Sequence, residues 1–185
     1  MHLIVDTHVR GKDLSMVYMN EPDSVESSVK TMKQLLAEDK YQVVGFDLEF
    51  TNSHAGQDQK VLVAQLCVRH DILVYHYHLT TRPCECFPGF INNPDYNFAM
   101  VDTTNDLKAL DLSCLTCKNL FNIHEQYKMK DESKKDKNAY HSAWDRRLDE
   151  EHVKYVAKDA YTSYNMYGRI IEMRMCLPPA IDEGS

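Results

Sequence analysis

The sequence lacks any apolar run long enough to cross a membrane, since a membrane-spanning helix needs about 20 consecutive apolar residues. The N-terminus, from Met1 to Asp6, also lacks the basic region followed by an apolar core that marks a secretory signal. Internal repeats and low-complexity segments are absent as well. We therefore expect a cytoplasmic or nuclear protein with no membrane partner. Its 185 residues predict one domain, 1–185, large enough to bury a core.

An excess of positive charge is also absent. The chain has 21 Lys and Arg residues against 28 Asp and Glu residues, a formal net charge of -7. A protein that holds long duplexes through many phosphate contacts needs a basic surface, so the charge disfavours that class. It does not exclude a nuclease whose bound metal ions supply the local positive charge. It also leaves room for a protein partner that contributes affinity for nucleic acid.

Cysteines are present, but a disulfide framework is not expected, because nothing indicates an oxidising compartment. Two pairs, Cys84-x-Cys86 and Cys114-x-x-Cys117, together offer four possible zinc ligands. The first spacing is unusually tight for a structural zinc site. Ordinary reduced thiols are the favoured interpretation.

The most informative stretch is Val43 to Thr51, an apolar run with two acidic residues in its middle. Side chains alternate along a strand, so Asp47 and Glu49 share one face while Phe46 and Leu48 share the other. Two adjacent carboxylates repel each other and lose solvation on burial, and a bound Mg²⁺ or Mn²⁺ ion offsets both effects. The alternative is an edge strand with a wetted acidic face.

The remaining elements predict a mixed α/β order, with helices that can cover a sheet. Asp23 is expected to cap the first helix, with Glu26 completing a capping box. Asp149 is expected to cap the last helix. The strand that contains Asp47 and the two that follow it predict an antiparallel meander. The expected strands are 3–9, 14–19, 43–51, 61–68, 72–78 and 98–101, and the expected helices are 23–39, a short one at 88–92, a segment from Leu107 onward, 118–127 and 149–173.

Two other features allow more than one interpretation. His76 and His78 would share a face of the strand 72–78 and offer metal ligands, although a partly exposed sheet edge is the commoner explanation. Lys128 to Asn138 is either a solvated linker or a loop that contacts phosphates, and its mixture of lysines and acids favours the linker. A polar tail follows Pro178 and Pro179.

Three motifs in order resemble the 3′–5′ exonuclease domains of the DEDD superfamily. They are Phe46-Asp47-Leu48-Glu49, then Asn105-Asp106 with its helix, and then Tyr155-Val156-Ala157-Lys158-Asp159-Ala160-Tyr161. The resemblance, supported by residues 63–68 and by Ser142-Ala143-Trp144, extends over about 43–173. It is to the tyrosine-bearing subgroup, which includes ribonuclease D, and especially to small stand-alone Werner-like proteins of plants.

The resemblance implies a ribonuclease H-like fold, a central mixed sheet flanked by helices. It also implies that Asp47, Glu49, Asp106 and Asp159 hold two Mg²⁺ or Mn²⁺ ions, which would serve phosphodiester hydrolysis. Tyr155 would position the attacking water by a hydrogen bond. The expected activity removes nucleotides from the 3′ end of single-stranded RNA or DNA.

Residues beside the motifs are candidates for contacts with bases. Leu48 and Tyr161 are predicted to bind substrate, with packing in the core as the alternative, and Phe50 is a further candidate for which core packing is favoured. Relatives carry a helical segment where this chain has the short, lysine-rich stretch Lys128 to Tyr140. A shortened cleft wall motivates the alternative hypothesis, a catalytically weak protein on the same fold that binds nucleic acid or regulates a partner.

Overall fold

The computed structural model describes residues 2–9, 11–51, 59–127 and 144–176. The whole stretch 128–140, which the sequence predicts to be a linker or a shortened cleft wall, and the tail 178–185 lie outside the described residues. Within the described part, no helix is long and apolar enough to cross a membrane.

Seven strands form one mixed sheet in the order β1-β2-β5-β4-β3-β6-β7. The hairpin of β1 and β2 is antiparallel, as are the pairs β3–β4 and β4–β5, which confirms the predicted meander. The pairs β2–β5, β3–β6 and β6–β7 are parallel. The strands are His2–Val9 (β1), Lys12–Met19 (β2), Val43–Phe50 (β3), Val61–Val68 (β4), Asp71–Tyr75 (β5), Asn97–Met100 (β6) and Leu120–Asn122 (β7).

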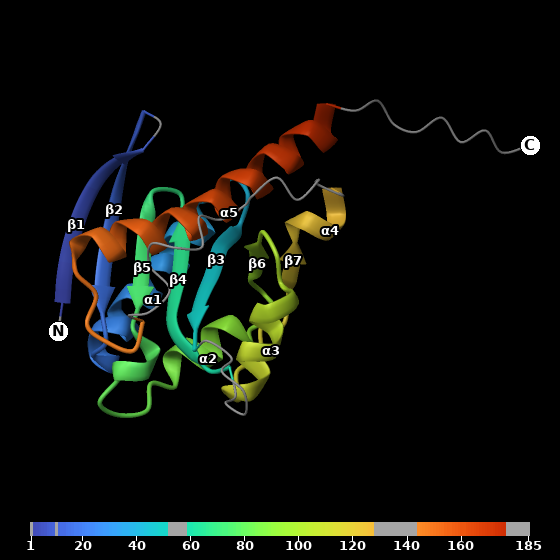
Figure 1. The fold of residues 1–185 in the computed structure, drawn as a ribbon. Coiled ribbons are helices and arrows are strands. Elements are labelled where there is room, and N and C mark those ends of the chain that lie inside the picture. The colour runs from blue at the N-terminus through green and yellow to red at the C-terminus, as the bar shows by residue number, and fades with distance from the viewer. Residues whose placement is uncertain (1, 10, 52–58, 128–143, 177–185) are drawn as a thin grey trace, which may run out of the picture.

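Helices cover both faces of this sheet (Figure 1). The longest, α5, crosses one face diagonally, and α1 and α2 pack on the other. The helices are Pro22–Ala37 (α1), Cys86–Ile91 (α2), Thr104–Leu112 (α3), Ile123–Tyr127 (α4) and Glu150–Cys176 (α5), with a 3-10 turn at Tyr77–Leu79 (η1).

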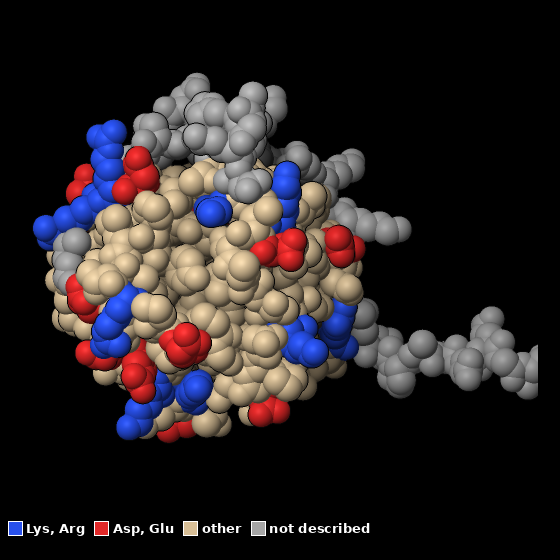
Figure 2. Space-filling model, turned by 90° about the horizontal axis from the view of Figure 1, so that it is seen from below, with Lys and Arg blue, Asp and Glu red and all other residues tan. Residues whose placement is uncertain are grey.

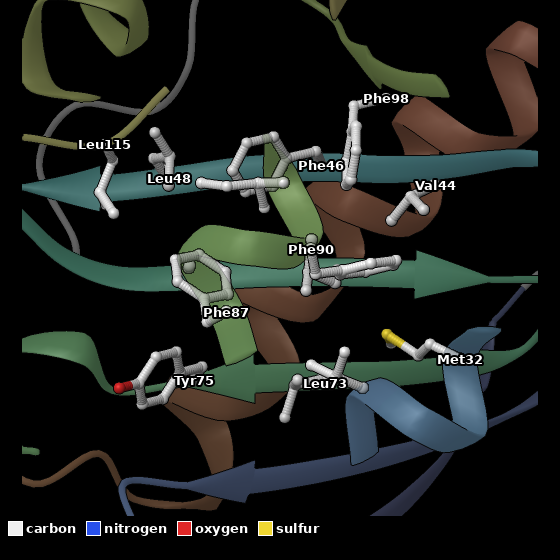
Figure 3. Close-up of a cluster of buried hydrophobic side chains, with 14 of the residues drawn as sticks. Met32, Val44, Phe46, Leu48, Leu73, Tyr75, Phe87, Phe90, Phe98 and Leu115 are labelled. Atoms are coloured by element: carbon white, nitrogen blue, oxygen red, sulfur yellow. The ribbon is translucent and has the colours of Figure 1, made fainter. Parts of the chain in front are cut away.

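The two faces carry separate apolar cores. On the α1 and α2 face, Phe46 and Leu48 of β3 pack against Phe87 and Phe90 of α2 (Figure 3). On the other face, the buried side of α5 packs against β4 and β5, with Val156 as one of its fully buried residues. β3 therefore places its large apolar side chains on one face, and its acidic side chains face α5, as the alternation predicts.

The predicted start of the first helix is wrong in detail. α1 begins at Pro22, and its N-cap, Glu21, makes no side-chain capping bond. Pro22 explains the difference, because its fixed φ suits the first helical position and it needs no partner for a missing N–H. Asp23 instead forms an ion pair with Arg82. No capping box with Glu26 forms.

Two further expectations are wrong. The segment Lys118 to Tyr127 is not one helix, because residues 120–122 form β7 and pair with β6 before α4 begins. β5 ends at Tyr75, so His76 and His78 do not share a strand face. His76 is fully buried and therefore does not lie on an exposed edge.

Candidate metal centre

Three carboxylates from two elements meet on the α5 face of the sheet. Asp47 and Glu49 extend from β3, and Asp159 extends from α5. One ligand oxygen from each lies within 4.8 Å of the others, and all three side chains are half-buried. Asp159 lies more than 100 positions after Asp47 and Glu49 in the sequence, so the fold creates the cluster.

A glycine permits this approach. Gly45, two residues before Asp47, packs directly against the backbone of α5. A Cβ at this position would lie 2.1 Å from the carbonyl oxygen of Ala160 and 2.6 Å from the backbone nitrogen of Tyr164. No real side chain fits in that space, so glycine is required where β3 and α5 meet. The contact holds Asp159, the neighbour of Ala160, beside β3.

A buried carboxylate fixes α5 on the C-terminal side of this contact. The Tyr164 hydroxyl donates a hydrogen bond of 2.7 Å to Asp39 Oδ1, and the backbone N–H of Tyr41 donates one of 3.1 Å to Oδ2. Arg69 Nε lies 3.4 Å from the same carboxylate. Burial and the hydrogen bond to Asp39 raise the pKa of Tyr164. These hydrogen bonds and Arg69 offset the unfavourable free energy of burying the charged carboxylate of Asp39.

A second buried network fixes the chain just before α5. His76 Nε2 lies 3.0 Å from the carbonyl oxygen of Trp144, so this nitrogen carries the proton. The other ring nitrogen therefore accepts from the Tyr18 hydroxyl, 2.8 Å away, and that hydroxyl accepts from the N–H of Leu148 at 3.2 Å. Burial lowers the pKa of His76 to about 4, so its ring is neutral at pH 7.

The cap predicted for the last helix is confirmed. The side chain of Asp149 accepts a hydrogen bond of 2.9 Å from the N–H of His152, and this bond lowers the pKa of Asp149. The ring of Tyr155, one turn before Asp159, stacks on Trp144 with 6.4 Å between centroids and 19° between planes. The His76 network thus holds the indole on which Tyr155 rests.

One buried polar side chain lies next to the cluster. Gln65 of β4 is directly opposite Asp47 in the antiparallel register and is fully buried. Neither its amide oxygen nor its amide nitrogen has a hydrogen-bond partner among the described residues. Residues opposite each other on antiparallel strands point to the same face, with Cβ atoms about 5 Å apart. Sequence reasoning did not single out Gln65, although a glutamine in an otherwise apolar strand is a visible signal.

The fourth predicted ligand is separate from this group. Asp106 lies in the first turn of α3 and is 9% exposed. It is not one of the three carboxylates that lie within 4.8 Å of one another. α3 packs against β3 near the cluster (Figure 1). Its role as a ligand stays a prediction.

The predicted substrate contacts are mostly covered by protein. Leu48 is 4% exposed and packs on the face of β3 opposite Asp47 (Figure 3). Phe50 is half-buried against the same core. Tyr161 is 8% exposed, with its ring 6.4 Å from that of His70. Packing is the interpretation this burial favours, and a substrate role for these residues stays a prediction.

The donor set fits a hard divalent cation. All three groups are carboxylates, the ligands that Mg²⁺ and Mn²⁺ prefer. Their partial exposure leaves room for water or substrate oxygens, and the unpartnered amide of Gln65 provides a further polar group on the same face. One face of the molecule carries charges of both signs rather than a continuous basic surface (Figure 2). On the face seen from below, Lys and Arg are interspersed with Asp and Glu around a largely uncharged centre (Figure 2).

Several solved structures share this fold. The EXO domain of Nibbler from Aedes aegypti matches 88% of this chain and 90% of its own, with a TM-score of 0.64 and 15% identity. RNase D of Escherichia coli, an exoribonuclease involved in structured RNA processing, matches 85% of this chain at a TM-score of 0.58 and 14% identity. This chain spans 43% of that protein. The EXD2 exonuclease domain, in a structure soaked in Mg and GMP, matches 92% of this chain and 98% of its own, with a TM-score of 0.50 and 15% identity.

No family model matches the sequence, and no curated protein matches it either. The fold is ribonuclease H-like, the α/β fold of exonuclease domains, as predicted. At these identities the likeness shows the fold alone. The Werner-like subgroup stays a prediction.

Proposed function

We propose that this chain is a metal-dependent 3′–5′ exonuclease that acts on single-stranded nucleic acid through one domain spanning the sequence. The observation that carries the proposal is the cluster of Asp47, Glu49 and Asp159, assembled from two elements on an exonuclease fold. A nucleic-acid substrate agrees with the exoribonuclease among the matched structures.

Asp47, Glu49, Asp106 and Asp159 would hold two Mg²⁺ or Mn²⁺ ions. When bound, such a pair supplies a water activated at neutral pH and stabilises the leaving oxygen of an in-line displacement. The carboxylates bind the ions and fix their position. Tyr155, held against Trp144, would orient the attacking water through its hydroxyl. Leu48 and Tyr161 remain candidate contacts for the substrate.

The test compares cleavage of single-stranded RNA and DNA by the wild-type protein and by Asp47→Asn, with Mg²⁺, with Mn²⁺ and with chelator. We expect cleavage with either ion and none with chelator or with the variant. Asp111→Asn is a matched control, because Asp111 is a carboxylate on α3 outside the cluster. It should leave the rate unchanged.

The outcome also decides between the two hypotheses. If the folded wild-type protein binds nucleic acid but cleaves none with either ion, the catalytically weak binding protein is the better account. If Asp47→Asn retains full activity, the cluster is not the active site.

A further inference from the structure

A polar cavity lies beside α5, between this helix and the tip of the β1–β2 hairpin. Its volume is about 550 Å³, within the range of about 300–1,000 Å³ that is typical of small-molecule sites. Four basic side chains line it: His8 and Lys12 from the hairpin, and Lys158 and Arg169 from α5. The nuclease centre uses none of them.

The residues of α5 that line this cavity do not include Asp159 of the acidic cluster. Lys158, Thr162, Asn165 and Arg169 follow one another along a single stripe of α5. Successive residues are rotated by about 100° around a helix, so Asp159 points to a different side from Lys158. The basic residues of α5 and Asp159 therefore lie on different stripes of the same helix, and no residue of the acidic cluster lines the cavity.

Within the described part of the chain, three of the four basic side chains, Lys12, Lys158 and Arg169, have no acid in direct contact with them. Among the described residues, no carboxylate oxygen lies within 4.0 Å of Lys12, Lys158 or Arg169. The fourth, His8, is paired with Asp13, and Arg169 acts on Glu172 only at longer range. Asp13 contacts His8 Nδ1 at 2.8 Å, and Glu172 contacts Lys40 Nζ at 2.8 Å. An acidic protein thus places three cations without a contacting acid around one concave site, which favours an anionic ligand.

The rest of the lining indicates more than a bare anion. Thr162 provides a hydroxyl donor beside the cations, while Val9, Met166 and the ring of Tyr161 provide apolar surface. Lysine and arginine bind phosphate, and aromatic and apolar side chains pack against bases. The volume accommodates both parts of such a ligand.

We propose that this cavity binds a phosphate-bearing nucleotide unit. The unit is supplied either by the single-stranded nucleic acid outside the active centre or by a free mononucleotide. The site goes beyond the proposed activity because no residue of the acidic cluster lines it, and Tyr161 is the one residue that the two proposals share. Only the choice of the nucleic-acid strand as occupant rests on the proposed function.

The test measures binding without turnover. A labelled single-stranded oligonucleotide is titrated with the full chain in chelator, and fluorescence anisotropy is recorded at several salt concentrations. The double variant Lys12→Glu/Arg169→Glu is compared with Lys30→Glu/Lys118→Glu, whose lysines are exposed and distant from the cavity in the sequence. Both double variants change the net charge from -7 to -11, so they differ only in position.

We expect the cavity variant to bind the oligonucleotide at least about tenfold more weakly. The slope of the logarithm of its binding constant against the logarithm of the salt concentration should be smaller in magnitude by about 1.4, which is about 0.7 for each lost phosphate contact. The control should retain wild-type affinity. Equal loss in both double variants, or loss in neither, would overturn the proposal. Competition by a nucleoside 5′-monophosphate identifies a free nucleotide as an occupant, and binding of the oligonucleotide alone identifies the strand.

A measurement on the wild-type protein covers the case in which the cavity variant does not fold. Lysine acetylation is mapped by mass spectrometry with and without oligonucleotide. Lys12 and Lys158 should be protected and Lys30 should not, and equal labelling of all three contradicts the proposal. Because neither assay requires metal or cleavage, failure of this site is distinguishable from failure of the nuclease.

Discussion

The contact between Gly45 and α5 gives the most quantitative prediction. In Gly45→Ala, the new Cβ would begin 2.1 Å from the carbonyl oxygen of Ala160, about 1.3 Å short of the 3.4 Å at which ordinary contact starts. The obstacle is backbone, so no side-chain rotation relieves it. The helix and the strand must separate, and Asp159 must move away from Asp47 and Glu49.

Two separate effects should follow from this displacement. Overpacking of a close-packed core costs about 1–3 kcal/mol, so the free energy of unfolding should fall by at least that much. A misplacement of about 1 Å in a catalytic group can reduce the rate about 100-fold. We therefore expect Gly45→Ala to lose metal affinity and activity to a larger extent than its loss of stability explains.

The assay combines urea unfolding with calorimetric titration of Mn²⁺ into the folded protein. Gly89→Ala is the matched control, because a Cβ at Gly89 in α2 has no heavy atom within 4 Å. It should be neutral or slightly stabilising, since alanine is favoured over glycine in a helix by about 1 kcal/mol. Wild-type stability and wild-type Mn²⁺ binding in Gly45→Ala would refute the close approach of β3 and α5.

Three other predictions concern the groups around the cluster. Because burial lowers the pKa of His76 from 6.5 to about 4, the unfolded chain takes up a proton between these pH values that the folded protein does not. Lowering the pH from 6.5 to about 4 should therefore decrease the free energy of unfolding, and His76 contributes about 3 kcal/mol of this decrease. Urea unfolding at a series of pH values should show a weaker dependence of the unfolding free energy on pH in His76→Gln than in the wild type. The same dependence in both proteins would contradict the low pKa of His76. Gln65→Met replaces an unpartnered buried amide and should raise the metal-free unfolding free energy by about 1 kcal/mol while lowering turnover. A loss of metal-free stability would show that the amide is satisfied. Tyr155→Phe should bind Mn²⁺ normally but cleave about 100-fold more slowly. Unchanged turnover would remove Tyr155 from the mechanism.

The sequence predicts those features that depend on local periodicity. The alternation around Asp47 correctly assigns Phe46 and Leu48 to one face of β3 and the acids to the other. Asp149 is recognisable as a cap because its partner, His152, is three residues away. In both cases the interacting groups are close in the chain.

The features that the sequence does not predict depend on distant partners. β7 resembles a helix because its hydrogen-bond partners in β6 lie about 20 residues earlier. His76 resembles an edge residue because Tyr18 and Trp144, which bury it, are remote in the chain. The basic cavity has the same origin, since the hairpin and α5 each contribute only part of it.

The most direct measurement of the central claim is a cleavage time course on single-stranded RNA and DNA labelled at either the 3′ or the 5′ end. With Mg²⁺ or Mn²⁺, we predict that the 5′-labelled strand shortens progressively while the 3′ label is released at once as a mononucleotide. The faster of the two nucleic acids identifies the preferred sugar. Internal fragments, shortening from the 5′ end, or cleavage that persists in chelator would contradict a metal-dependent 3′–5′ exonuclease.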